Sequence, residues 1–237
     1  MSNKNELNQP VGAPVNNWVE ALKPSINEMI GQYCAVLPLN IDAHAESLYS
    51  AFTQDKENKN WTYLPYGPFE NFNEFKAWIT GVANKDDPIF YVVIDKKNNL
   101  VVGLTSYLRI NQRHGVIEVG HIHYSPLMQR TPMATEVMFL MMQYAFETLN
   151  YRRYEWKCDS LNEKSNQAAL RLGFSFEGIF RQAIVYKGRN RDTAWYSILD
   201  SDWPRLKQAF LLWLSPSNFD GDGQQLISLG SMISKKL

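Results

Sequence analysis

A strand, a short polar turn and an amphipathic helix follow one another between Glu118 and Glu147, and this succession constrains the fold most. The apolar run through Tyr124 is bounded by Pro126. Thr131 is placed as a helix N-cap, and Pro132 takes the first helical position, where its missing N–H costs nothing. The helix therefore starts at a predictable point, directly after a strand.

The apolar residues of this helix recur at spacings of three and four, which predicts one face that packs on a sheet. They are Val137, Leu140, Met141, Tyr144, Ala145 and Leu149. The N-terminus of the helix is left free, and its backbone N–H groups and dipole favour an anion such as a pyrophosphate. Arg130 adds a full charge there. The alternative is an ordinary strand-to-helix connection, since the glycines that usually let a backbone close on a phosphate are absent.

Length and composition favour one globular domain, because 237 residues with 45% hydrophobic content can bury a sizeable core. The 24 basic and 24 acidic residues balance to a net charge of zero. Such a chain has no overall field to attract nucleic acid or an anionic membrane. We therefore expect neither as a partner.

Cys34 and Cys158 show no pairing pattern, which is typical of reduced thiols in a cytosolic protein. The first ten residues lack a signal-peptide pattern, and the apolar run from Val137 to Met142 is far short of a membrane span. We expect a soluble, cytoplasmic protein.

No metal is expected, because the histidines lack metal-ligand spacing with carboxylates or thiols; they are His44, His114, His121 and His123.

The first half of the chain predicts a tail or strap over residues 1–32, followed by a domain over residues 33–204. Tyr33 to Leu39 is expected to be a strand, and Asp42 to cap the helix after it. The aromatic segment from Trp61 to Phe69 contains two prolines and a glycine, so it is expected to be a loop that lines a pocket or covers a core edge. Glu70 to Ala83 is expected to be a second helix.

Ile89 to Ile94 and Leu100 to Ile110 are expected to pair as antiparallel strands across a polar turn. The strand from Val116 to Tyr124 precedes the key helix, and the strand from Arg152 to Cys158 follows it. Two strands that flank a helix in this way form a βαβ unit, so they should be parallel.

Beyond that unit, Asn162 is expected to cap a short helix that ends at Gly173. Ala183 to Lys187 and Thr193 to Leu199 predict a hairpin, and Trp203 to Leu214 predicts a helix. The residues from 205 to 237 are expected to form this C-terminal helix and a tail that pack on the same domain.

Four motifs in this order resemble the GNAT superfamily of acyl-CoA-dependent N-acetyltransferases, and look closest to the branch of ribosomal-protein N-terminal acetyltransferases. They cover roughly residues 33–204 and read IEVG, SPLMQRTPMATEV, NEKSNQAALRLGFSFEGIFR and GRNRDTAWYSILDSDWP. The resemblance implies a mixed α/β (α+β) fold with a twisted mixed sheet, flanked by helices and splayed in a V at the strands around the key helix. It also implies acetyl-CoA as cosubstrate in that V, and a monomer or homodimer.

Carried over to this chain, the resemblance assigns the cofactor-binding residues. The phosphate loop falls on Gln129, Arg130, Thr131, Pro132, Met133, Ala134 and Thr135. The pantetheine arm falls on the backbone of His121, Ile122, His123 and Tyr124. Asn162 matches the asparagine that meets the CoA arm, and Ser165 the hydroxyl near the CoA sulfur. The sequence departs from the family at Arg130 and Pro132, where glycines are common.

Acetylation of an amine needs a base for the ammonium proton and an acid for the departing thiolate. Ser165 is the candidate acid, or Tyr154 or Tyr196 if the serine is misplaced. Glu118 is the candidate base, since a buried carboxylate there would have a raised pKa, although it could instead simply pair with an arginine. His121 or His123 could relay a proton, or be held by backbone groups.

The acceptor is expected to meet Asp192 and Tyr196. Asp192 could hold an amine, while the neighbouring Arg189 and Arg191 could hold a carboxylate or a CoA phosphate; the alternative is a solvated hairpin tip. The predicted function is transfer of an acetyl group from acetyl-CoA to a primary amine of a small molecule or of a peptide or protein N-terminus, by direct attack. The alternative is a non-catalytic acyl-CoA-binding or sensing protein.

Overall fold

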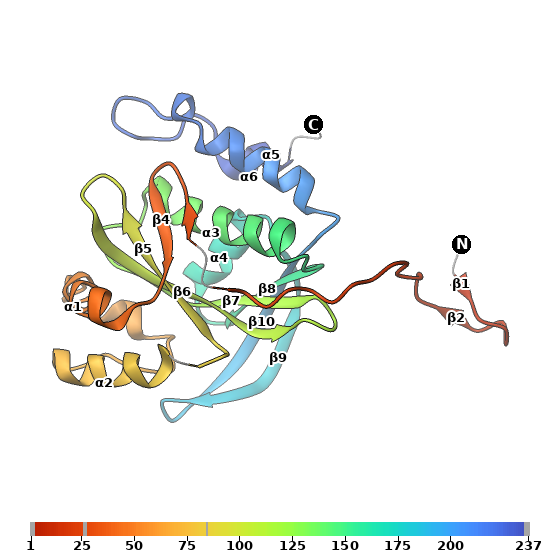
Figure 1. Ribbon diagram of the computed structural model, residues 1–237, viewed down its shortest axis with the longest axis horizontal. Helices are drawn as coiled ribbons and strands as arrows, with labels where there is room; N and C mark the ends of the chain where they lie inside the picture. The colour runs from red at the N-terminus through yellow and green to blue at the C-terminus, as the bar shows by residue number, and fades with distance from the viewer. Residues whose placement is uncertain (1–2, 26–27, 84, 235–237) are drawn as a thin grey trace.

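The computed structural model describes residues 3–25, 28–83 and 85–234 of the chain. Its centre is an eight-stranded mixed sheet in the spatial order β3-β4-β5-β6-β7-β8-β10-β9 (Figure 1). The strands are β3 (Met29–Ile30), β4 (Cys34–Pro38), β5 (Ile89–Asp95), β6 (Leu100–Asn111), β7 (Val116–Tyr124), β8 (Arg153–Asp159), β9 (Ser175–Tyr186) and β10 (Arg189–Leu199). Neighbours are antiparallel except β7 and β8, which are parallel, so the mixed sheet predicted from the sequence is confirmed.

Helices cover both faces of this sheet, and each face has its own hydrophobic core (Figure 1). On one face lie α1 (Ile41–Phe52) and α2 (Phe72–Ala83). On the other lie α3 (Pro132–Gln143), α4 (Glu163–Arg171) and α5 (Trp203–Leu214). The short helices are η1 (Lys59–Trp61), η2 (Tyr144–Thr148), η3 (Pro216–Asn218) and α6 (Leu229–Ser234).

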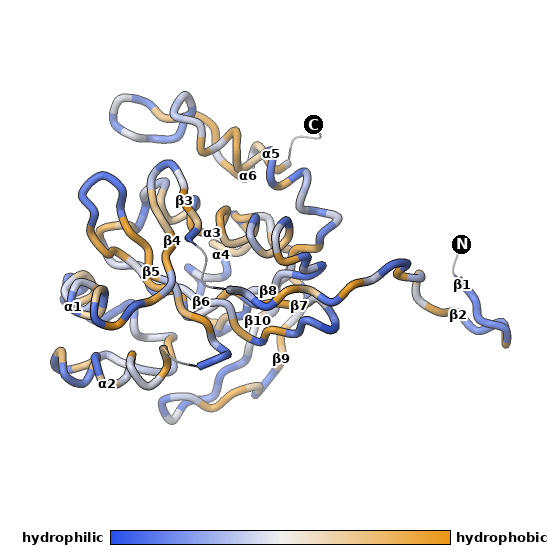
Figure 2. Tube along the Cα trace, in the orientation of Figure 1, coloured by the Kyte–Doolittle hydropathy of each residue, from blue (hydrophilic) through white to orange (hydrophobic). Residues whose placement is uncertain are grey.

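Apolar residues follow the central strands, whereas the turn between β5 and β6 is hydrophilic (Figure 2). In β5 the residues Phe90 to Val93 are buried because helices cover both faces of the sheet there. This double cover explains why the runs are nearly continuous rather than alternating.

Several predicted element ends differ from the structure: α2 begins at Phe72 rather than Glu70, and β10 begins at Arg189 rather than Thr193. The first helix starts at Ile41, two residues earlier than a cap at Asp42 predicts, because Asn40 is its N-cap. The Asn40 side chain accepts the N–H of Ala43 at 3.0 Å, and Asp42 lies inside the first turn. Strand β9 begins at Ser175, eight residues before the predicted Ala183. Its early residues are largely exposed on an edge strand, so they carry no burial pattern that marks a strand.

The N-terminal segment begins as a small hairpin, β1 (Asn3–Lys4) with β2 (Pro10–Val11), that projects away from the body (Figure 1). Further along, Ala21 is buried and the N–H of Leu22 bonds the carbonyl of Leu149 at 2.9 Å. At the other end, Phe139 of α3 packs its ring against Trp203 and Phe210 of α5. Residues 1, 2, 26, 27 and 235–237 of the predicted terminal segments lie outside the described residues.

Within the described part of the chain, the helices are too short or too polar to cross a membrane.

Candidate active site

Strands β7 and β8 separate partway along their length. Their parallel pairing runs from Val116 with Arg153 to Val119 with Trp156. Beyond this point β7 stays with β6 up to Tyr124, and β8 stays with β10 up to Asp159. The described residues 120–124 and 157–159 do not pair across the gap, so their facing backbone groups can bond a ligand as an added strand would. This fork confirms the predicted V.

A β-bulge lies where the strands part. His121 has a φ of 50°, and the register between β6 and β7 shifts between Leu104 and Ser106. A bulge bends its strand, so it carries β7 away from β8. The His121 ring stacks on Tyr66 beside α2, with 3.1 Å between Nδ1 and the phenol oxygen. Burial lowers the pKa of His121 to about 4, so the imidazole is neutral near pH 7.

A cavity of about 820 Å³ opens from the fork toward α3, α4 and the C-terminal part of the chain. Nine of the predicted cofactor-binding residues line it: Ile122, His123, Tyr124, Gln129, Arg130, Thr131, Pro132, Ala134 and Thr135. Met133 instead points into the core. The ring of His123 stacks on Phe52 at 3.8 Å and is buried on the α1 face, which lowers the pKa of His123 to about 3.

The N-terminus of α3 faces this cavity without a side-chain cap. Thr131 occupies the N-cap position as predicted, but its hydroxyl donates to the carbonyl of Met128 at 2.7 Å and accepts no helix N–H. Pro132 follows as the first helical residue. The positive end of the helix is therefore available to an anion.

The charged residues that line the cavity within the described chain are all cations: Arg130, Lys164 and Arg171. None of the three is joined to a described carboxylate by an ion pair. A concentration of unpaired positive charge in a chain of zero net charge points to a ligand with several negative charges.

The N-terminus of α4 adjoins the inner end of the cavity. Asn162 caps it as predicted, accepting the N–H of Ser165 at 3.2 Å. The Ser165 hydroxyl accepts the indole N–H of Trp156 at 3.0 Å, and Trp156 lines the cavity. Ser165 thus lies next to the last paired residue of β8, where the fork opens.

The two tyrosines considered as alternative acids lie on the same side of the sheet as α4. The phenol of Tyr196 donates to Asn166 at 2.8 Å, and Asn166 also accepts the thiol of Cys158 at 3.0 Å. Burial raises the pKa of Tyr196. Tyr154 is fully buried among core aromatic rings, which raises its pKa well above the usual range. Both tyrosines therefore lie on the side of the sheet that α3 and α4 cover.

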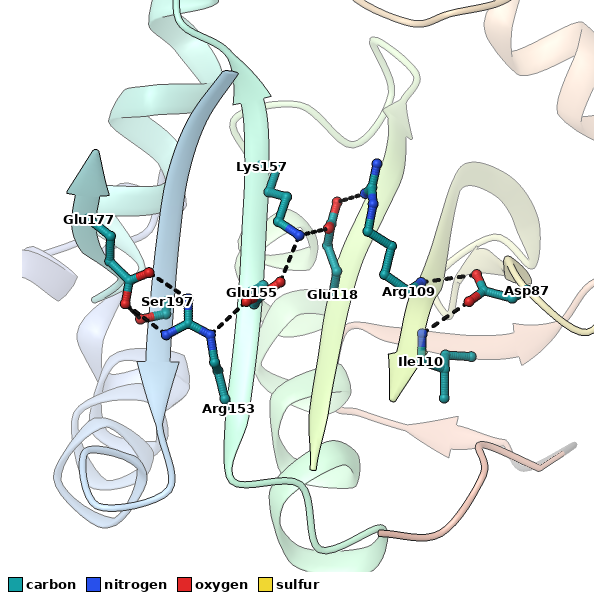
Figure 3. A network of polar contacts seen from close by, with 9 residues as sticks. All are labelled: Asp87, Arg109, Ile110, Glu118, Arg153, Glu155, Lys157, Glu177 and Ser197. Atoms are coloured by element: carbon teal, nitrogen blue, oxygen red, sulfur yellow. Dashed lines mark hydrogen bonds and ion pairs between the residues drawn. The ribbon is translucent and has the colours of Figure 1, made fainter. Parts of the chain in front are cut away.

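Glu118 lies on that opposite face, at the base of the fork (Figure 3). Val119 and Trp156 turn into the α3 core, so Glu118, one residue earlier, points the other way. Its carboxylate is 2.7 Å from Nη1 of Arg109 and 2.9 Å from Nζ of Lys157. Burial raises the pKa of Glu118, and the two cations oppose that rise without cancelling it.

The contacts of Glu118 belong to a line of alternating charges that crosses the sheet (Figure 3). Lys157 also contacts Glu155 at 2.7 Å, and its ammonium lies 3.7 Å from the ring centroid of Trp195. Arg153 continues the line from Glu155 to Glu177. The alternative for Glu118 was a simple pairing with an arginine. Arg109 is such a partner, and the buried Lys157 is a second one.

The hairpin between β9 and β10 reaches across to the aromatic loop. Lys187 donates to the carbonyl of Trp61 at 2.8 Å, and Arg189 donates to that of Thr62 at 3.0 Å. Asp192 is half-buried and accepts the N–H of Gln182 at 2.8 Å, the contact that most lowers the pKa of Asp192. This carboxylate shapes the hairpin, and the structure does not bring Asp192 and Tyr196 together.

Several residues of the site were missed by the sequence analysis. Arg153, Glu155 and Lys157 alternate along β8, and this run of charges on one face of a strand was an available signal. Arg109, Arg171 and Trp213 come from distant parts of the chain, and no local pattern joins them to the site.

Comparison with known proteins gives consistent results. The sequence model described as "Acetyltransferase (GNAT) domain" matches residues 36–175. The crystal structure of a GCN5-related N-acetyltransferase from Brucella melitensis is 46% identical, covers 93% of this chain and 100% of its own, and superposes with a TM-score of 0.92.

Two curated proteins are more distant. The uncharacterised N-acetyltransferase YoaA of Bacillus subtilis is 24% identical over 158 residues, which are 67% of this chain and 89% of that protein. The ribosomal-protein-serine acetyltransferase of Escherichia coli is 30% identical over 106 residues, 44% of this chain and 59% of that protein.

Proposed function

The chain belongs to the GNAT family of acetyltransferases, and on this premise we propose that it transfers the acetyl group of acetyl-CoA to a primary amine. The acceptor is a small molecule or the N-terminus of a peptide or protein, and the amine attacks the thioester directly. The observation that carries the proposal is the fork between β7 and β8, which opens on a cavity whose described charged residues are cations.

Acetyl-CoA fits the groups that meet at this cavity. A pyrophosphate matches the uncapped N-terminus of α3 and the charge of Arg130. The amide-rich pantetheine arm matches the unpaired edge of β7 at Ile122 and His123. In this orientation the thioester would lie at the base of the fork, near Trp156 and Ser165.

The two proton-transfer roles fall on opposite faces of the sheet. Glu118 takes the ammonium proton, directly or through water, and its raised pKa makes it a stronger base than an ordinary glutamate. The amine nitrogen then forms a bond to the acetyl carbon as the carbon–sulfur bond breaks. Ser165 supplies a proton to the sulfur from the α4 side, and the proton that the acylated nitrogen releases restores the serine hydroxyl through water. The fork between the two faces is where donor and acceptor would meet.

Substitution of the two residues tests this assignment against a binding protein without turnover. Glu118→Gln and Ser165→Ala should each lower turnover by roughly 10² to 10⁴-fold, the usual contribution of acid or base catalysis. Both should keep CoA affinity, because the groups assigned to the phosphates, Arg130 and the start of α3, stay unchanged. Release of free thiol from acetyl-CoA, measured over a panel of amines and peptides, gives the rate, and calorimetry gives the affinity.

Glu46→Gln is a matched control, because Glu46 is exposed on α1. If the wild-type protein binds acetyl-CoA but consumes none across the panel, the non-catalytic function replaces the proposed one.

A further inference from the structure

The outer wall of the cavity comes from the C-terminal part of the chain. Trp213 of α5 lines the cavity together with Phe219, Gly223, Gln224 and Gln225 of the loop over residues 219–225, called here the C-terminal loop. All of these residues lie after residues 36–175, the part matched to the GNAT domain. This wall therefore lies outside the part of the chain that the family model matches.

The C-terminal loop is held by contacts within itself and with Trp213. Phe219 and Gln225 pair as a β-bridge, and the indole of Trp213 donates to the Gln225 side chain at 2.7 Å. The ring of Phe219 meets that of Trp213 edge to face at 5.1 Å. Asp220, the acidic residue at its start, accepts N–H groups of the loop itself. The wall facing the cavity is therefore aromatic and amide in character.

Arg171 stands opposite this wall. Its Nη2 donates to the hydroxyl of Thr135 at 2.7 Å, and its guanidinium lies 5.7 Å from the ring centroid of Trp213. Arg171 is an exposed residue, and these two contacts hold its guanidinium at the cavity. No described carboxylate forms an ion pair with it. A phosphate would supply the missing anion with a geometry that suits a guanidinium.

We propose that Arg171, Trp213 and the C-terminal loop form a subsite for the nucleotide half of the carrier, with the base against the aromatic wall and the 3′-phosphate on Arg171. The inference rests on the proposed use of acetyl-CoA. The pyrophosphate is assigned to Arg130 and the start of α3, which leaves Lys164 and Arg171 among the described cations of the cavity. Arg171 is the one that contacts Trp213 of the aromatic wall, so the third phosphate group is assigned to it. Such a subsite favours acetyl-CoA, which contains the nucleotide, over a phosphopantetheine thioester, which lacks it.

Adenosine 3′,5′-bisphosphate, the nucleotide half alone, tests the subsite through tryptophan fluorescence. The two tryptophans that line the cavity lie at different ends: Trp156 at the fork and Trp213 at the outer wall. The fragment should quench emission in the wild-type protein and in Trp156→Phe, and the quenching should be lost in Trp213→Phe. Quenching that survives in Trp213→Phe, or none in the wild type, overturns the proposal.

Calorimetry with CoA and dephospho-CoA, which lacks the 3′-phosphate, tests the role of Arg171. Wild-type protein should bind CoA about tenfold or more tightly than dephospho-CoA, as expected for a lost charge-assisted contact. In Arg171→Gln this ratio should fall to about one, while Arg113→Gln, at an exposed arginine in the turn between β6 and β7, should keep it. If Arg171→Gln weakened the binding of CoA and dephospho-CoA by the same factor, the proposal would be overturned, because Arg171 would then contact the pyrophosphate.

The outcome for the proposed function is separate. If acetyl-CoA is consumed with an amine but the nucleotide fragment does not reach Trp213, only the subsite is wrong. If acetyl-CoA neither binds nor reacts, both proposals fail.

Discussion

Glu118 combines burial with two cationic neighbours, and this combination decides how it titrates. Only 4% of its side chain is exposed, which favours the neutral acid, while Arg109 and Lys157 favour the carboxylate. The first effect is the larger, so the pKa of Glu118 is raised. The residue can therefore lose and regain a proton at a pH where an exposed glutamate would remain ionised.

This titration predicts the pH dependence of the reaction. If ionised Glu118 is the base, kcat/KM should fall as the pH drops through its raised pKa, above the value of about 4.3 of an ordinary glutamate. A pH profile of the wild-type enzyme and of Glu118→Gln measures this. The acid limb should be absent from the residual activity of the variant. An identical limb in both proteins would assign it to another group.

At the scale of elements, Glu136 joins α3 to the start of β4. Its buried carboxylate accepts the backbone N–H groups of Gln32, Tyr33 and Cys34 at 2.6, 2.8 and 2.8 Å. Gly31 passes so close that a Cβ there would lie 2.4 Å from the Glu136 carboxyl carbon. One side chain thus holds α3, the helix that carries the proposed anion site, against the sheet.

Replacement of Glu136 by alanine should lower the free energy of unfolding by roughly 3 kcal/mol, because three N–H groups lose a charged acceptor and stay partly buried. For a chain of this size that corresponds to a fall in Tm of about 6–12 °C. Urea unfolding and thermal melts check the value, with Glu46→Ala on exposed α1 as a control expected to stay within about 0.5 kcal/mol. A loss as small as that of the control would show that water replaces the carboxylate.

The outer end of the charge line predicts a change of stability with pH. Arg153 lowers the pKa of Glu177 to about 2, so the pair stabilises the fold above the ordinary pKa of about 4.3. That stability is lost as the pH falls toward 2. Because 39% of the Glu177 side chain is exposed, water screens the pair and the effect is under about 1 kcal/mol.

Urea unfolding at pH 5 and pH 3 should therefore show a smaller drop for Glu177→Gln than for the wild type. Glu46→Gln is the control and should follow the wild type. Equal drops in Glu177→Gln and the wild type would mean that the ion pair is fully screened.

Elements with strong local signals were predicted closely. β7 and α5 have the bounds expected from the sequence, because a proline bounds the apolar run of the first and lies in the first turn of the second. β9 was predicted only in part, since its exposed Phe176, Ile179 and Phe180 lie on an edge strand with register shifts. Its extent is set by pairing with β10, which is a tertiary effect.

At the scale of the whole molecule, the site is built on both faces of one sheet, and this limits how many of its residues the sequence alone can predict. The motif around Thr131 predicted the start of α3 and the parallel pair, because one continuous segment builds both. The partners of Glu118 come from β6 and β8, and the outer wall of the cavity comes from α5 and the C-terminal loop. Only the folded sheet and the packing of α5 on α3 bring these segments together.

The central claim is that the gap between β7 and β8 holds acetyl-CoA, and amide hydrogen exchange with and without acetyl-CoA tests it most directly. Peptides covering residues 120–125 and 129–135 should exchange more slowly when the ligand is bound, because the pantetheine arm and the phosphates would cover their N–H groups. The exposed N-terminal hairpin, residues 3–11, should not change. Saturating acetyl-CoA that leaves both peptides unprotected would contradict the account.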